Sequence, residues 1–230
     1  MPNKNQVTVI GTIHNQHLSS KKYSLKVFSD IIKTINPDVV LAEIPPDRFV
    51  IAKQQFQKLG KIQEPRVLQY PEFSKVIFPL QKELGFELKP VSAWTEEMAN
   101  AREEKLEELS ADKNRANDWK TYIEARQLSA KMFEDYVTEF DPVTIHTNEF
   151  DQILNVELQV FSDLFNNDLG KGGWENINEA HYQLIDAELN KITNQGKKVV
   201  IIFGSGHKGW LLNKLKTRTD IVIKNLLDII

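Results

Sequence analysis

The chain of 230 residues contains no cysteine. This absence excludes disulfide bonds, thiol catalysis and thiolate ligands, so a metal site would have to use nitrogen and oxygen atoms. No apolar segment approaches the roughly 20 residues of a membrane-spanning helix. The formal net charge of −3 gives no general attraction to nucleic acid or to anionic membranes. We expect a soluble cytoplasmic protein without a signal peptide, whose partners are neither nucleic acid nor membrane.

Short apolar runs that alternate with helical patterns predict an α/β fold. Buried strands are expected at residues 7–10, 38–44, 86–91, 199–203 and 220–223. The first helix is expected to have Ser19 or Ser20 as its N-cap and to stop at Asn36-Pro37. Because strands joined through helices form parallel pairs, the sheet should be mostly parallel and built from both ends of the chain.

The composition shifts after Thr95, which suggests a helical insertion. Residues 96–109 are rich in Glu, Ala, Arg and Lys, which are good helix formers, and helical periodicity returns at 118–140, 148–166 and 175–193. We therefore assign residues 1–95 and 196–230 to the α/β core and residues 96–195 to a helical insertion that packs on it. The charged face of the insertion is expected to be solvated, with a partner surface as the alternative.

Polar residues end three of the predicted strands. Gly11–His14 and Gly204–His207 both have the pattern Gly-x-x-His after a strand, and Glu43 ends the second strand. Because the carboxyl ends of parallel strands lie at one edge of a sheet, these side chains should share one site. Two imidazoles and a carboxylate match a divalent-metal site with open positions. The alternative is that the histidines are hydrogen-bonded loop residues and that Glu43 caps a turn.

Four further residues are candidates for supporting roles. His17 could be another ligand or could support the site, and a surface histidine is the alternative. Asn178 and His181 could face the site if their helix packs over the strand ends. Arg48 could orient a carboxylate or clamp an anionic substrate, and an ordinary salt bridge is the alternative. His146 lies in a predicted loop without supporting spacing, so no role is predicted for it.

The same turn offers a rival interpretation. Gly204-x-Gly206-x-x-Gly209 follows a strand and opens a helix, as in the dinucleotide-binding fingerprint. That fingerprint requires an acidic residue at the end of the next strand, where the sequence has Lys224-Asn225. It also leaves His14 and Glu43 unexplained. The metal site is therefore the preferred interpretation.

Gly11–His14, Glu43 in Leu-Ala-Glu-Ile-Pro, and Gly204–His207 together resemble the TraB/Tiki superfamily, which includes erythromycin-esterase-like and ChaN-like proteins. The resemblance covers about residues 5–50 and 175–225. It implies an α/β core with a helical insertion and a site made by His14, Glu43 and His207. Tiki-like members are metal-dependent proteases, for which manganese or cobalt is the usual suggestion. Erythromycin-esterase-like members use histidine and glutamate without a required metal, and ChaN-like members bind haem.

The chain departs from this superfamily in two respects. Many TraB/Tiki members carry an arginine in the helix before the last motif, but the segment 174–181 contains none. Asn178 and His181 are the candidates for its place. A membrane anchor like that of Tiki is also missing, so secreted signalling substrates are not expected.

The sequence therefore predicts a metal-dependent hydrolase of the TraB/Tiki type that acts on an ester or amide bond. His14, Glu43 and His207 would be its catalytic residues and its ligands for Mn, Co or Zn. The substrate would be a small molecule or a peptide. Two alternatives stay open, a metal-free hydrolase that uses His and Glu, and a non-catalytic protein that binds haem or another ligand. Homo-oligomer formation stays open as well.

Overall fold

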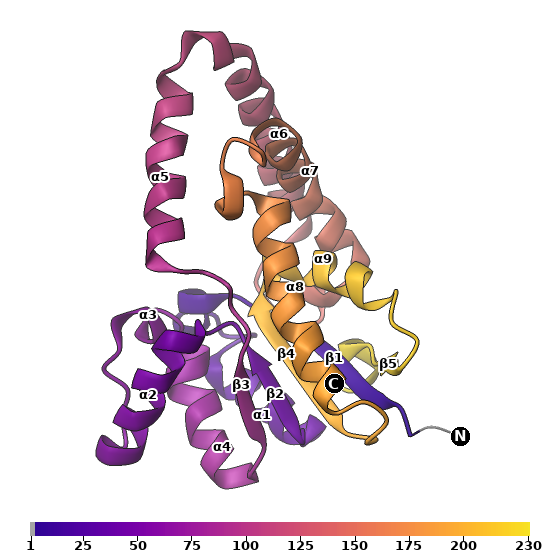
Figure 1. The fold of residues 1–230 in the computed structure, drawn as a ribbon. Helices are drawn as coiled ribbons and strands as arrows, with labels where there is room; N and C mark the ends of the chain where they lie inside the picture. Colours follow the sequence, from indigo (N-terminus) through magenta and orange to yellow (C-terminus); the bar gives the residue numbers. More distant parts are fainter. Residues whose placement is uncertain (1–2) are drawn as a thin grey trace.

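The computed structural model describes residues 3–230, and within them the strands form one five-stranded sheet, all parallel, in the order β3-β2-β4-β1-β5 (Figure 1). The strands are β1 (Asn5–Thr12), β2 (Val39–Ala42), β3 (Glu87–Pro90), β4 (Lys198–Gly204) and β5 (Ile221–Ile223). Both ends of the chain thus contribute to the sheet, which confirms the predicted α/β class. β4 lies between β1 and β2, so segments distant in the sequence meet at its centre.

The register of the central strands sets the position of the site. Thr12 pairs with Gly204, and Ala42 pairs with Ile202. The carboxyl ends of β1, β2 and β4 therefore lie side by side. Every residue of β4 after Lys198 is buried, because helices cover both faces of the sheet.

Two apolar clusters hold the helices on the sheet. On one face, Ile10, Val200 and Ile202 pack with residues of α1 (Leu25–Ile35) and α4 (Phe78–Leu84). On the other face, Val9, Ile201 and Phe203 pack with residues of α8 (Trp174–Lys191) and α9 (Ser205–Leu215). The chain between β2 and β3 also forms α2 (Pro46–Leu59), α3 (Pro65–Leu68) and a π-helical turn (Phe73–Ile77).

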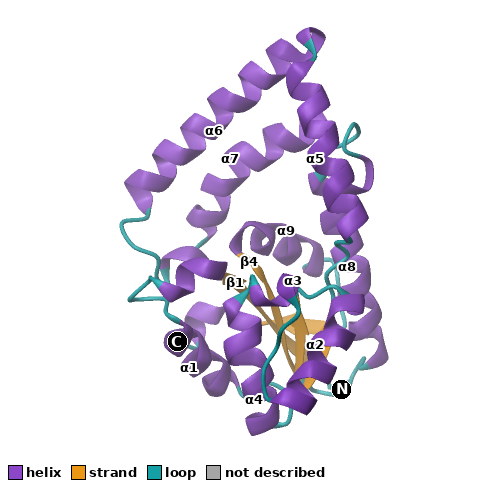
Figure 2. Ribbon diagram, turned by 90° about the vertical axis from the view of Figure 1, so that its left-hand side faces the viewer, coloured by secondary structure: helices purple, strands orange, loops and turns teal. Residues whose placement is uncertain are grey.

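The predicted insertion has two parts in space. Helices α5 (Glu96–Ala111), α6 (Ala116–Tyr136) and α7 (Asn148–Phe165) project away from the sheet (Figures 1 and 2). They enclose a small apolar cluster of their own, which includes Leu109, Phe161 and Phe165. Helix α8 instead returns to pack on the sheet. Among the described residues, no helix has the length and apolarity needed to cross a membrane.

The start of the first helix differs from the prediction. Residues 14–18 form a 3-10 turn, and α1 begins only after Ser24, whose hydroxyl accepts a hydrogen bond from the Val27 N–H. Neither Ser19 nor Ser20 caps it. The Ser20 hydroxyl instead donates to the Phe140 carbonyl and accepts from the Tyr23 N–H, so it ties this loop to the chain before α7.

Candidate metal centre at the strand ends

Glu43 lies directly after β2 and turns its carboxylate toward the end of β4. Its Oε2 accepts a hydrogen bond of 2.7 Å from the Gly204 N–H. Burial raises the pKa of Glu43 to about 7, although the charge of His14 and the Gly204 N–H act in the opposite direction. The carboxylate is therefore held by backbone at one oxygen, while the other faces His207.

His207 lies in the first turn of α9 with its ring fixed by α8. Asn178 donates from Nδ2 to the Trp174 carbonyl at 2.7 Å, which sets the orientation of its amide. Asn178 Oδ1 then accepts from Nδ1–H of His207 at 2.6 Å. Nε2 of His207 keeps its lone pair, 3.9 Å from Oε1 of Glu43. Burial, helped by the charge of His14, lowers the pKa of His207 to about 4.

His14 reaches the same place from the end of β1. Its backbone has φ +49°, a left-handed conformation that is uncommon for a residue with a side chain and that tends to occur at functional sites. Nδ1 of the ring is 2.7 Å from Oε1 of the buried Glu72. Burial lowers the pKa of His14, but the hydrogen bond and charge of Glu72 and the charge of Glu43 outweigh it, so the net shift is upward.

Gly204 makes this approach possible. A Cβ at Gly204 would lie 2.6 Å from Nε2 of His14 and 3.7 Å from Oε2 of Glu43. Nε2 of His14 thus rests against the bare Cα of Gly204, beside the carboxylate. A glycine is required here because of this close approach.

His181 extends from α8 into the same region and is fully buried. A ring nitrogen of His181 lies within 4.8 Å of ligand atoms of both Glu43 and His207, and His14 stands outside that compact group. However, Nδ1 of His181 accepts a hydrogen bond of 2.8 Å from the Ala93 N–H. Burial lowers the pKa of His181 to about 2, so the ring is neutral and its proton is on Nε2. This buried Nε2–H has no partner in the described part of the chain.

The ring tautomers decide which residues could hold a cation. A metal-binding histidine coordinates through a lone pair, while its other nitrogen donates to a carboxylate or carbonyl. His14 and His207 meet this requirement, because each donates from Nδ1 and, within residues 3–230, no hydrogen bond occupies Nε2. His181 would have to give up Ala93. The donor set suited to a divalent cation is therefore His14, Glu43 and His207, with His181 as a hydrogen-bond donor beside them.

Two predicted supporting residues turn out to be structural. His17 is buried, so it is not a surface histidine, and both of its nitrogens bond to backbone, Nε2 to the Ile13 N–H and Nδ1 to the Tyr23 carbonyl. It has no nitrogen left for a metal, and it holds the backbone next to His14. Arg48 forms ion pairs with Asp47, Glu64 and Glu96, as the salt-bridge alternative predicted.

The structure also bears on the dinucleotide-binding alternative and on His146. β4 passes directly into α9 without a loop, and the Gly204 N–H is taken by Glu43, so no phosphate-binding turn forms. His146, to which no role was assigned, accepts the Gly11 N–H at Nε2. The pairing of β1 with β5 stops at Val7. The His146 ring therefore supplies an acceptor for a β1 N–H that lies beyond the end of β5.

Neither Glu72 nor Tyr70 stands out in the sequence as a site residue. Both precede the π-helical turn, and π-helical turns often occur at functional sites. The Tyr70 ring lies 4.7 Å from the His14 ring, centroid to centroid. In the sequence Glu72 follows Pro71 at the start of a helical pattern, where an acidic residue is ordinary. Its partner, 58 residues away, becomes apparent only in the fold.

A cavity of about 620 Å³ opens beside Glu43, a size that suits a small molecule or part of a peptide. Its walls come from the turns after β2 and β3, from α3 and from α5. The lining includes Glu43, Arg66, Tyr70, Ser92, Trp94 and Arg102.

Comparison with known proteins gives no relative for this chain. No family model matches it, and neither a curated protein nor a solved structure matches it significantly. The resemblance to the TraB/Tiki superfamily therefore stays a prediction from the residues. What the molecule can do has to be argued from the site itself.

Proposed function

We propose that this protein is a metal-dependent hydrolase that cleaves an ester or amide bond, as in the TraB/Tiki superfamily. His14, Glu43 and His207 would hold a divalent cation, with Mn, Co and Zn as the candidates. One observation carries the proposal. Two histidines from opposite ends of the chain each have Nδ1 fixed by an acceptor, Glu72 or Asn178, and each keeps Nε2 free beside the same carboxylate.

The chain's own residues supply most of the remaining requirements of such a reaction. When bound, a divalent cation would lower the pKa of a water molecule and polarise a carbonyl oxygen. Oε1 of Glu43 is the oxygen that the Gly204 N–H does not use, so it is the atom placed to accept a proton from water when Glu43 is not itself a ligand of the cation. The buried Nε2–H of His181 offers a hydrogen bond to a developing oxyanion.

A metal-free hydrolase is the second candidate, and the pKa of Glu43 favours it. A carboxylate with a pKa of about 7 is well suited to general base catalysis at neutral pH, without help from a cation. Activity that survives exhaustive chelation would select this candidate over the first. The haem-binding alternative has less support, because charged and polar residues line much of the cavity, whereas a haem needs a large apolar slot.

The decisive experiment measures metal content and hydrolysis on the same preparations. Elemental analysis after purification, followed by Co²⁺ titration monitored by absorbance, is expected to give one cation per chain for the wild type. His207→Ala and Glu43→Ala should lose the cation and the hydrolysis of 4-nitrophenyl acetate or of a peptide panel. Thermal unfolding checks that both variants fold. If the cation remains at full occupancy in both variants, the proposed ligand set is wrong.

A further inference from the structure

Three arginines line the cavity beside Glu43, and two of them have no acidic partner. Arg48 is paired with Asp47, Glu64 and Glu96. Within residues 3–230, Arg66 and Arg102 form no ion pair, and Nη1 of Arg66 is buried without a hydrogen-bond acceptor. Both side chains are partly buried, and a buried polar atom without a hydrogen-bond partner costs about 1–3 kcal/mol. Such an arrangement needs a reason.

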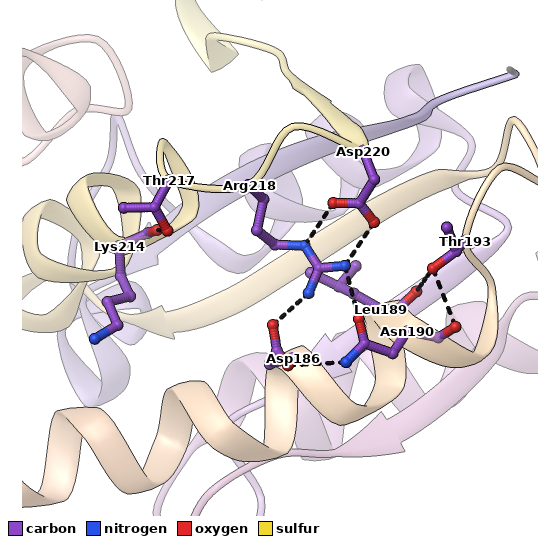
Figure 3. Close-up of polar contacts among 8 residues, drawn as sticks. All are labelled: Asp186, Leu189, Asn190, Thr193, Lys214, Thr217, Arg218 and Asp220. Carbon is purple, nitrogen blue, oxygen red and sulfur yellow. Dashed lines mark hydrogen bonds and ion pairs between the residues drawn. The ribbon is translucent and has the colours of Figure 1, made fainter.

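The chain shows elsewhere how it satisfies a buried arginine. Arg218, after α9, donates to Asp186 and to Asn190 of α8 and makes two further hydrogen bonds to Asp220 (Figure 3). Its side chain is only 9% exposed. An arginine that holds elements together is thus surrounded by acceptors in this fold. Arg66 and Arg102 differ from it in this respect.

The acidic side chains that line the cavity already have partners within the protein. Glu64 and Glu96 face Arg48, and Glu64 also accepts the Val67 N–H. Glu43 accepts the Gly204 N–H. The positive charges of the other two arginines are therefore left for something that enters the cavity.

The two arginines come from different parts of the molecule. Arg66 lies on α3, in the core, near the phenol of Tyr70; burial raises the pKa of that phenol, and the charge of Arg66 acts in the opposite direction. Arg102 lies on α5, in the projecting helices, and its guanidinium packs 5.5 Å from the centre of the Phe161 ring. Burial lowers the pKa of Arg102. Both arginines line the cavity that Glu43 also lines.

We infer that this cavity binds an oxyanion, a carboxylate or a phosphate group, at Arg66 and Arg102. Guanidinium groups form charge-assisted hydrogen bonds with both kinds of oxyanion. This inference rests on the proposed function, because it names the substrate class of the same site. The hydrolysed ester or amide would belong to an anionic molecule, whose charged end lies at Arg66 and Arg102 and whose scissile bond faces Glu43.

Anion binding to metal-free protein tests the inference. Isothermal titration calorimetry with inorganic phosphate and, separately, with succinate distinguishes the two oxyanions. Saturable binding of at least one is expected for the wild type, and it should weaken as ionic strength rises. Arg66→Gln and Arg102→Gln should each lower the affinity about tenfold. Arg126→Gln is the matched control, because Arg126 is an exposed arginine of α6 outside the cavity.

The outcomes separate this inference from the proposed function. The same titrations on His207→Ala exclude an anion held by a cation, and binding that keeps its arginine dependence there supports the inference even if no metal is found. Two results would overturn it: a folded wild type that binds neither anion, or an Arg66→Gln/Arg102→Gln double variant that binds as tightly as the wild type. Either result would leave metal binding and hydrolysis, measured separately, as they stand.

Discussion

The buried polar groups at the two ends of the sheet differ in whether they have hydrogen-bond partners. At the amino end, the buried Asn5 side chain donates to the Ile192 carbonyl and accepts from the Lys197 N–H. At the carboxyl end, His181 Nε2 and Glu72 Oε2 are buried without partners among the described residues. An unsatisfied buried polar atom costs about 1–3 kcal/mol, so each needs an explanation. Among these groups, the one at the amino end has its partners, and the two at the carboxyl end, where a ligand would enter, do not.

The histidines show the same contrast within one residue type. His17, His146 and His181 each accept a backbone N–H at a ring nitrogen. His14 and His207 each donate from Nδ1 to a side chain and keep Nε2 free. The first group ties backbone segments together in the neutral state, and the second is prepared for a ligand. Sequence position alone does not separate the two groups.

The largest effect on metal binding is expected from a substitution at Gly204. In Gly204→Ala, the added methyl would lie 2.6 Å from Nε2 of His14, so the ring has to move away from Glu43. We expect metal affinity to fall about 100-fold, measured by Co²⁺ titration. Gly206→Ala is the matched control, since its Cβ meets only Trp174 at 3.8 Å. It should bind metal normally and stabilise α9 by about 0.5–1 kcal/mol. Equal metal affinities in the two variants would contradict the proposed geometry.

Two arginine variants should have opposite effects on the free energy of unfolding and on anion binding. Arg218→Gln removes the partner of Asp186 and Asp220, so the free energy of unfolding in urea should fall by about 1–3 kcal/mol while anion binding stays unchanged. Arg66→Gln removes a charge without an acidic partner among the described residues, so stability should stay within about 0.5 kcal/mol or rise, while the affinity for the anion falls about tenfold. A clear loss of stability in Arg66→Gln would show that Arg66 serves the fold instead.

Much of the architecture could be predicted from the sequence, because buried parallel strands are apolar on both faces. The runs before Gly11 and Gly204 marked the two central strands, and their parallel pairing placed His14 and His207 at one edge. The turn residues were less informative. Ser19 was as suitable a cap as Ser24, and only the 3-10 turn at 14–18 excludes it.

The surroundings of the site could not be predicted, for a physical reason. Whether a histidine is a ligand depends on which nitrogen carries the proton, and that depends on acceptors far away in the chain. Glu72 and Asn178 reach their histidines across 58 and 29 residues. In the same way, Arg66 resembles any surface arginine until the fold brings it to the same cavity as Glu43 and Arg102.

The support that Glu72 gives to His14 predicts an intermediate effect. Glu72→Gln keeps the size of the side chain but removes its negative charge, so Nε2 of His14 becomes a weaker donor to a cation. Metal affinity should fall about tenfold, the lower end of the range for such partners. Glu83→Gln on α4 is the control, because Glu83 is exposed and pairs with Lys33. If both variants bind Co²⁺ like the wild type, His14 does not belong to the ligand set.

An effect that appears only on acidification concerns His146, one of the backbone-binding histidines. Burial lowers its pKa to about 3, and the nearby charge of Lys208 acts in the same direction. In the unfolded chain its pKa is the ordinary value near 6.5. The stability that neutral His146 contributes is therefore complete above pH 6.5 and is lost as the pH falls from 6.5 toward 3. Protonation of Nε2 would also break its bond to the Gly11 N–H.

Urea unfolding between pH 7.5 and 4.5 measures this effect as a difference between wild type and His146→Gln. The glutamine amide oxygen can still accept the Gly11 N–H, but it does not titrate. The wild type should therefore lose stability more steeply below pH 6.5, by up to about 1.4 kcal/mol per pH unit relative to the variant. Carboxylates that titrate in both proteins cancel in the comparison. Parallel pH profiles would mean that His146 is protonated as easily in the folded protein as in the unfolded chain. The proposed distinction between backbone-binding and ligand-binding histidines would then be wrong for His146.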